Sequence, residues 1–581
     1  MSKIKAFTIE LKTHKIIYLI LVSVIILGIF LRVYKHAELL HFELDQARDV
    51  FVVYDMLNDG NIPLLGPYAR GSELYLGPIF YYFQAIPAFF FGTFPSIVAW
   101  PDLIFSILFL PLFYFFARLY FSREVSVMIT ALAATSLFLV TYGRFAWNPN
   151  ALPFWMTLAM YGLLRAWNNK VFSLRWFLVM VGASAVVMQL HFVAFLTVPL
   201  IVVSYMIFVR MRLTWKPIFL SIGLLCLLFT PIIVSEFQTS GANTKSFFAT
   251  IVDKGDKDDS HNIIEKIFRG IQETATYNLV LLTSNQSGGD NIRTKKTADS
   301  YFLCDSDCRG QLPVHIVAMS IFAIISIVFL YQFIQQWKRC KENITNNNIY
   351  QRYLLIILWL LWSGVFLVLM AYQISPRFYL LIVPAFLVMF GTVLQLLQKR
   401  FGRVGKYVSI GIVSLLIIFN LVSTWQYFSI LNNVLCNVET HCNASLREDW
   451  RDLIMNRNDY ITLGQLRGVA HYIGKQGGES KFFIVGDNRY ARALYFLTNI
   501  ENNISNAQCY IKRSNFETKQ VEGREYYVLV RTKSKTHVND EMLVNHDITD
   551  EKSFGTVTLY RMVPKNMNNN ITEIPKGCFV R

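Results

Sequence analysis

Charged residues are scarce in this chain: Asp, Glu, Lys and Arg together make up 16% of its 581 residues, against about 25% in a typical soluble domain. Hydrophobic residues make up 54% and aromatic residues 15%. A water-soluble domain cannot hide that much apolar surface, because its polar residues have to cover the exterior. The composition therefore excludes an ordinary cytosolic enzyme, a disordered chain and a coiled coil.

The sequence also lacks the short motifs of nucleotide and metal chemistry. It contains no Walker A loop, no GxGxxG turn after a strand, no HExxH pair and no GxSxG elbow. Its long apolar runs hold almost no carboxylates, whereas proton-coupled transporters need ionisable residues within the membrane. These absences disfavour an ATP-driven pump and a proton-coupled transporter. No cofactor is expected, and only a divalent cation is left open.

The apolar residues gather in runs long enough to cross a bilayer, which takes about 20 residues of α-helix. We therefore predict an α-helical polytopic membrane protein with about eleven spans. A further apolar run at 77–93 is interpreted as an interfacial helix on the outer surface, because its aromatic residues suit that depth. The predicted spans cover residues 16–31, 97–117, 125–143, 150–165, 176–190, 192–209, 217–234, 312–333, 353–375, 378–397 and 408–430.

The net charge of +16 points to cytoplasmic loops and not to a nucleic-acid partner, since Lys and Arg collect on the inner side of membrane proteins. An arrangement with a cytoplasmic N-terminus places the basic clusters inside. We therefore predict a multi-pass protein of the cell (inner or plasma) membrane. Segments 36–98, 236–311 and 431–581 then lie outside, and the last is predicted to be a small extracytoplasmic α/β domain after a transmembrane module at 1–430.

Within that tail, the spacing of apolar residues predicts a helix at 463–475 and strands at 482–485, 526–531 and 556–560. Six of the eight cysteines fall in the predicted outer segments, and six cysteines allow fifteen pairings. A zinc site at Cys304 and Cys308 is disfavoured because a second pair of ligands is missing. Grouping by segment favours the pairs Cys304–Cys308, Cys436–Cys442 and Cys509–Cys578.

The first outer segment opens with three charged residues, Asp45, Arg48 and Asp49. On a helix they share one face, because residues three and four positions apart are neighbours. A carboxylate beside an arginine at the membrane surface could act as a base next to an anion site. A solvated amphipathic helix explains the same spacing, and the spacing alone does not decide between the two.

Arg144 and Arg377 each stand alone in a short outer turn. Such an arginine either extends its charge to the interface or binds a phosphate through its planar donor fork. His191 lies at the same level, where a structural hydrogen bond competes with a ligand or catalytic role. Asn148 is typical of a turn residue.

Three motifs follow one another in the first part of the chain: Asp45-Gln46-Ala47-Arg48, Gly77-Pro78-Ile79-Phe80-Tyr81-Tyr82 and Gly143-Arg144-Phe145-Ala146. In their order and spacing they resemble the motifs of the GT-C class of membrane glycosyltransferases. Within that class the chain resembles glycosyltransferase family 39, with its protein O-mannosyltransferase and aminoarabinose-transferase relatives. The family pattern has Glu where this chain has Gln46 and Asp where it has Asn148.

The resemblance implies an inverting transfer of a sugar from a polyprenyl-phosphate donor to a hydroxyl of a lipid, glycan or protein acceptor, beside membrane lipids, at the outer face. Asp45 would be the catalytic base. The alternatives are a non-enzymatic lipid or polysaccharide transporter and an unrelated glycan ligase or polymerase. Expected contacts to the donor phosphate are Arg48, Arg70, Arg144 and Arg377, and expected contacts to the substrates are Gln46, Glu73, Tyr81, Tyr82, Asn148 and His191.

Overall fold

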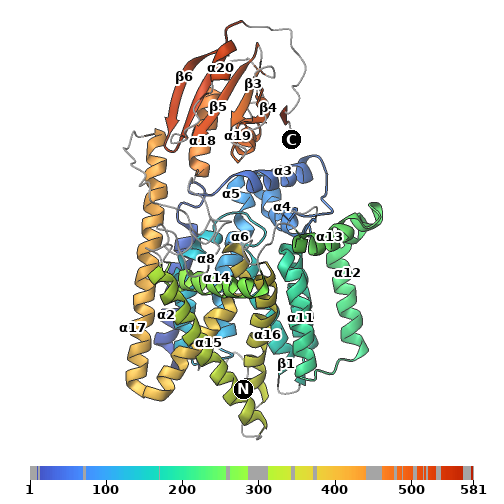
Figure 1. The fold of residues 1–581 in the computed structure, drawn as a ribbon, viewed down its shortest axis with the longest axis vertical. Helices are drawn as coiled ribbons and strands as arrows, with labels where there is room; N and C mark the ends of the chain where they lie inside the picture. Colours follow the sequence, from blue (N-terminus) through green and yellow to red (C-terminus); the bar gives the residue numbers. More distant parts are fainter. Residues whose placement is uncertain are drawn as a thin grey trace.

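A helical bundle carries a β-sheet domain at one end in the computed structural model (Figure 1). Helix α17 and a layer of short helices connect the two parts. The structure describes residues 10, 13–69, 74–168, 171–256, 262–284, 312–341, 347–370, 376–439, 461–476, 481–486, 489–501, 507–513, 516–517, 521, 523–531, 538, 540–566 and 578–579.

The long bundle helices lie where the apolar runs predict them. Among the described residues, six segments are long and apolar enough to cross a membrane, so the predicted number of eleven spans stays a prediction. The bundle consists of α2 (Lys15–Val33), α6 (Trp100–Ala117), α7 (Arg123–Thr135), α8 (Leu137–Tyr142), α9 (Leu152–Ala166), α10 (Leu174–Leu190), α11 (Phe192–Phe208), α12 (Trp215–Gln238), α15 (Leu312–Lys341), α16 (Asn347–Leu369) and α17 (Val383–Glu439).

Three of the expected spans differ in detail from the helices observed. The run at 125–143 is broken at Ser136, whose hydroxyl donates a hydrogen bond to the carbonyl of Leu281 at 2.8 Å. The runs at 378–397 and 408–430 belong to α17, which turns back sharply at Gly402 (Figure 1). Gly402 has a φ of 52°, a conformation that glycine adopts readily.

The layer above the bundle is formed by α3 (Leu44–Asn58), α4 (Ile79–Phe91) and α5 (Pro95–Val98), with α13 (Ala242–Asp256) beside it (Figure 1). Helix α4 occupies the predicted interfacial run and exposes Phe89 and Phe90. The predicted outer segment 236–311 contains α14 (Ile263–Thr283), which packs against the bundle through residues 275–282. A two-stranded hairpin, β1 (Trp167–Asn168) with β2 (Val171–Phe172), and the 3-10 helix η2 (Pro376–Leu381) complete this part.

The predicted α/β domain contains a six-stranded sheet in the order β6-β7-β5-β3-β4-β8. The central strand β3 (Phe482–Gly486) is parallel to β4 (Ala507–Lys512) and β5 (Glu525–Arg531), and the remaining pairs are antiparallel. Cys509 and Cys578 form a disulfide, the pair expected from the sequence. The other elements are α18 (Leu463–Gln476), α19 (Ala491–Phe496), the π-helix η3 (Leu497–Glu501), α20 (Asp540–Asn545), β6 (His546–Phe554), β7 (Val557–Pro564) and β8 (Cys578–Phe579).

The domain sits directly on α3 (Figure 1). The ring of Phe51 meets that of Phe496 edge to face, with centroids 5.0 Å apart, and stacks on Tyr495 at 6.2 Å. The start of α18 is hydrogen-bonded to the segment before α3, because the amide of Leu463 donates to the carbonyl of Leu40 at 2.8 Å. The sheet domain is therefore attached at two places, Phe51 and Leu40, to the part of the chain that carries the Asp45 motif.

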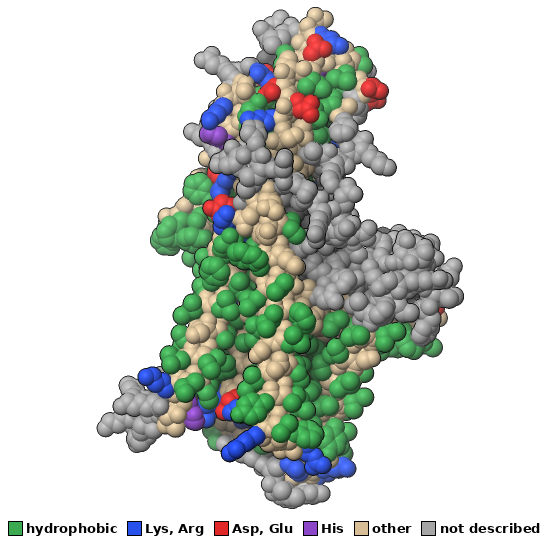
Figure 2. Space-filling view, turned by 90° about the vertical axis from the view of Figure 1, so that its left-hand side faces the viewer, with side chains coloured by type: hydrophobic (Ala, Val, Ile, Leu, Met, Phe, Trp, Pro, Cys, Tyr) green, Lys and Arg blue, Asp and Glu red, His purple; other side chains and the backbone are tan. Residues whose placement is uncertain are grey.

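Hydrophobic side chains cover the bundle along its height, and basic side chains gather at the end remote from the sheet (Figure 2). The exposed basic residues around the turn of α17 are Lys399, Arg400, Arg403 and Lys406. This distribution is typical of a membrane-embedded bundle with one basic end. Which side of the membrane that end faces stays a prediction.

Candidate active site

Helix α3 begins with a capping arrangement that fixes its first turn. The side-chain oxygen of Gln46 accepts a hydrogen bond from the amide of Glu43 at 3.3 Å, and its Nε2 donates to the carbonyl of Ala146 at 3.0 Å. Gln46 is buried. Its amide thus ties the start of α3 to the turn at 143–150, and the expected substrate contact through Gln46 has little support from this arrangement.

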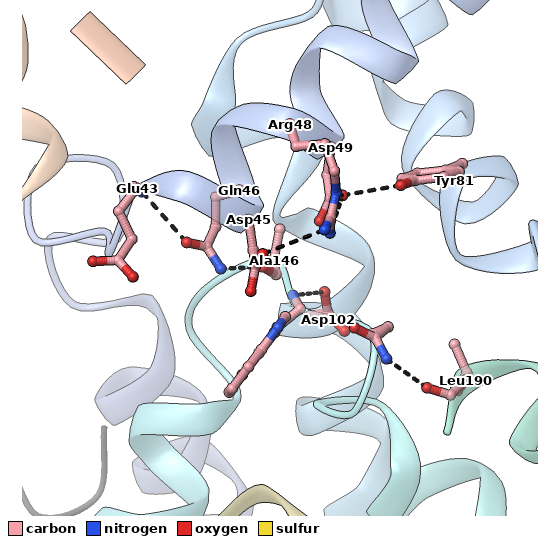
Figure 3. A network of polar contacts seen from close by, with 11 residues as sticks. Glu43, Asp45, Gln46, Arg48, Asp49, Tyr81, Asp102, Ala146 and Leu190 are labelled. Carbon is pink, nitrogen blue, oxygen red and sulfur yellow. Dashed lines mark hydrogen bonds and ion pairs between the residues drawn. The ribbon is translucent and has the colours of Figure 1, made fainter. Parts of the chain in front are cut away.

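The three charged residues of α3 form one cluster with α4 (Figure 3). The guanidinium of Arg48 contacts Asp49 Oδ1 at 2.7 Å and Asp45 Oδ1 at 3.3 Å. The hydroxyl of Tyr81 donates to the same oxygen of Asp49 at 3.1 Å. The predicted common face of the helix is confirmed by these contacts.

The two carboxylates of this cluster have different surroundings. The side chain of Asp45 is 30% exposed, whereas that of Asp49 is 0% exposed. Burial raises the pKa of Asp49 to about 6, with Arg48 acting in the opposite direction. Burial also disfavours the charge of Arg48, but Asp49, Tyr81 and Asp45 outweigh it and raise the pKa of Arg48. The accessible carboxylate of the cluster is therefore Asp45.

A third carboxylate, Asp102, lies below the cluster at the start of α6 (Figure 3). It accepts a hydrogen bond from the amide of Trp147 at 3.1 Å and is buried. Asp49 is near enough for the two charges to interact. Sequence reasoning did not include Asp102 in the site, although a carboxylate opening an apolar helix is a signal that could have found it.

The turn at 143–150 joins this cluster to the next helices. Asn148 Nδ2 donates to the carbonyl of Leu190 at 2.6 Å, which places the turn against the end of α10. The guanidinium of Arg377 lies over the ring of Trp147, 4.5 Å from its centroid. Arg377 thus reaches the residue whose amide binds Asp102.

His191 lies between α10 and α11, beside η2. Its Nδ1 accepts a hydrogen bond from the amide of Val193 at 3.2 Å, and its ring meets that of Phe378 at 4.8 Å. Burial lowers the pKa of His191 to about 3, and the charge of Arg377 lowers it further. His191 is therefore neutral at ordinary pH and caps α11, which favours the structural alternative.

Arg144 has a structural role that the sequence analysis did not foresee. Its guanidinium donates to the carbonyls of Leu31, Arg32 and Tyr34 at 2.6–3.1 Å, and it lies 4.8 Å from the ring centroid of Phe428. A cation at the end of α2 satisfies carbonyls that have no partner within the helix. With its donor fork directed at this backbone, Arg144 is not placed to bind a phosphate.

Tyr82, which was expected to contact the substrates, contacts the backbone of its own outer segment. The hydroxyl of Tyr82 donates to the carbonyl of Pro63 at 2.7 Å, which fixes the loop before α4.

No group of three or more His, Cys, Asp or Glu that could hold a metal ion occurs in the part of the chain that the structure describes. The roles expected of Arg70, Glu73 and the cysteines at 304, 308, 436 and 442 concern side chains that lie outside the described residues.

No protein-family model matches the chain, and no curated protein matches its sequence. Its fold is similar to that of apo ArnT from Cupriavidus metallidurans, with a TM-score of 0.53 and 11% identity, over 95% of this chain and 98% of that chain. ArnT bound to undecaprenyl phosphate aligns with a TM-score of 0.48, 10% identity and coverages of 96% and 100%. The oligosaccharyltransferase AglB from Archaeoglobus fulgidus, in complex with an inhibitory peptide and a dolichol-phosphate, gives 0.49 and 12%, over 98% of this chain and 76% of that chain.

The chain therefore has the fold of the GT-C membrane glycosyltransferases. This confirms the predicted fold class, a GT-C-like helical membrane protein with a C-terminal α/β domain. At 11% identity the likeness establishes the architecture, and the chemistry has to be argued from the residues of the site.

Proposed function

We propose that the protein is an inverting glycosyltransferase that moves a sugar from a polyprenyl-phosphate donor to an acceptor hydroxyl, with Asp45 as the catalytic base. The observation that carries this proposal is the partly exposed carboxylate of Asp45, held by Arg48 in the layer above the bundle. A lipid phosphate with its tail in the bilayer would present its sugar at this level. The GT-C fold supports the reaction class, and the sugar and acceptor stay open.

The reaction is a single displacement. The acceptor oxygen attacks the anomeric carbon, the bond from that carbon to the phosphate oxygen breaks, and the acceptor proton passes to Asp45. The lipid phosphate leaves with both electrons of the broken bond, and the configuration inverts. Because a phosphate is a weak base, its departure requires stabilisation of negative charge and no acid catalyst. Arg377, over Trp147, and Arg48 are the proposed sources of that positive charge.

Asp49 is proposed to position the site and not to act as the base. Its Oδ1 is engaged by Arg48 and Tyr81 and is closed off from solvent. In this arrangement Asp49 orients the guanidinium of Arg48, which in turn holds Asp45. Removal of the Asp45 carboxylate should then reduce activity by removing the base, and removal of the Asp49 carboxylate should reduce it by misplacing Arg48.

The test is transfer from radiolabelled polyprenyl-phosphate sugars to acceptors in a membrane extract, comparing the wild type with Asp45→Asn. Asn retains the shape but cannot take the proton, so we expect a rate about a hundredfold to ten-thousandfold lower. Donor affinity and the melting temperature should stay near wild type, because Asp45 is partly exposed.

Asp49→Asn is the matched control, one turn along the same helix. We expect it to reduce the rate less than Asp45→Asn does, because it weakens the contact that orients Arg48 but leaves Asp45 in place. If Asp49→Asn abolished transfer while Asp45→Asn retained it, the assignment of the base would be wrong. Absence of transfer from every polyprenyl-phosphate sugar by the wild type would refute the enzyme proposal itself.

A further inference from the structure

A second polar site lies at the opposite end of the bundle from the Asp45 cluster. A cavity of about 30 Å³ opens between the end of α9, the β1 hairpin, α11 and the start of α16, near the bottom of Figure 1. That volume holds roughly two water-sized groups. The residues that line it are Leu119, Leu164, Arg165, Trp167, Asn168, Tyr205, Asn348, Gln351 and Arg352.

The lining consists mainly of hydrogen-bond donors. It includes two guanidinium groups, Arg165 and Arg352, and no Asp or Glu occurs among the described residues around the cavity. The Nδ2 of Asn348 donates to Asn168 at 2.7 Å, which holds the start of α16 against β1. A site with two like charges and no counter-charge favours an anion.

Two buried donors in the lining are unsatisfied. Tyr205 is 0% exposed, and its hydroxyl has no hydrogen-bond partner. The indole Nε1 of Trp167 is likewise buried without one. Arg352 is close enough to Tyr205 for its charge to act on the hydroxyl. A buried donor without a partner costs about 1–3 kcal/mol, so this arrangement is explained if an acceptor enters the cavity.

We propose that this cavity binds two oxygens of a phosphate group, between Arg165, Arg352 and the hydroxyl of Tyr205, with the rest of the group at its mouth. A phosphate supplies several acceptor oxygens and the charge that two arginines require. Its source is either the headgroup of a membrane lipid or a free phosphate. The surroundings resemble a membrane surface, because Ile207 and Phe208, which follow Tyr205 on α11, are exposed apolar residues. The site is separate from the proposed reaction.

The experiment measures the shift in melting temperature of the full-length protein in detergent on titration with dioctanoyl phosphatidic acid and, separately, with inorganic phosphate. Dioctanoylglycerol, which lacks the phosphate, is the control ligand. We expect a saturable stabilisation by phosphatidic acid and none by dioctanoylglycerol. Saturation by inorganic phosphate with the same apparent affinity would identify free phosphate as the source.

Three variants decide whether the cavity is responsible. Tyr205→Phe and Arg165→Gln should each weaken phosphate binding at least tenfold. Arg175→Gln is the matched control, because Arg175 lies over the same Trp176 ring as Arg165 but does not line the cavity, and it should bind as the wild type does. Tyr205→Phe only removes a hydroxyl, so its fold is retained. If Tyr205→Phe and Arg165→Gln each bound phosphatidic acid and inorganic phosphate as tightly as the wild type does, the proposal would be overturned.

Discussion

At the scale of single residues, the site turns on the contrast between two aspartates one turn apart. Asp45 keeps part of its surface open, and Asp49 is enclosed by Arg48 and Tyr81. Identical side chains acquire different tasks when burial and partners differ. The sequence analysis placed both on one helix face, but their exposure depends on α4 and the turn at 143–150, which come from elsewhere in the chain.

The pH dependence of stability should report on Asp49. Its pKa in the folded protein is about 6, against about 3.9 in an unfolded chain. The folded state therefore binds more protons between about pH 4 and 6, and the contribution of Asp49 to stability falls as the pH rises through that window. We expect the melting temperature of the wild type, relative to Asp49→Asn, to decrease from pH 4 to 6 and then level off. A difference that is constant across a pH series of thermal unfolding would contradict this.

Two arginines that look alike in the sequence should behave differently on replacement by lysine. Arg377→Lys retains the charge but loses the planar fork, and we expect donor binding to weaken by about ten- to a hundredfold with little change in melting temperature. Arg144→Lys should instead lower stability by about 1–3 kcal/mol, because the carbonyls at the end of α2 lose their donors. Binding of a radiolabelled donor and thermal unfolding separate the two, and the reverse pattern would mean that their roles are exchanged.

At the scale of elements, the apolar runs predicted the helices well because hydrophobic length is a property of the local sequence. The predicted helix at 463–475 and the strands at 482–485, 526–531 and 556–560 are likewise confirmed. The order of the sheet could not be predicted, because β3 pairs with both of the strands that follow it and β4 pairs with the last strand, β8. The role of Arg144 was not predictable either, since it depends on the end of a helix more than one hundred residues earlier.

The contact between α3 and the sheet domain should be needed for activity. Phe51 is 6% exposed and packs on Tyr495 and Phe496, so Phe51→Ala should destabilise the protein by about 3–5 kcal/mol and reduce transfer by loosening α3. Phe89→Ala, the same truncation at a side chain that is 72% exposed, is the control and should change neither property. Unfolding curves and transfer rates measure both. Full activity of Phe51→Ala would show that α3 holds its place without the domain.

At the scale of the whole molecule, the predicted orientation can be tested with a membrane-impermeant maleimide. Cys340, at the end of α15, should be protected in intact cells and labelled after permeabilisation. A cysteine introduced as Val544→Cys, at an exposed position of α20, should be labelled in intact cells. A background with Cys226→Ser removes the exposed cysteine of α12. Labelling of Cys340 in intact cells, without labelling of Val544→Cys, would show that the orientation is the reverse of the predicted one.

The straight part of α17 is longer than a bilayer is thick. From Gly402 to Glu439 the helix rises by about 55 Å, well beyond the roughly 30 Å of a hydrocarbon core. The helix reaches the level of the sheet domain, and the domain sits on α3 (Figure 1). The domain therefore lies over α3, on the side away from the bundle (Figure 1). For the proposed transferase, an acceptor would then approach along the membrane surface, which favours flat or extended molecules over bulky folded ones.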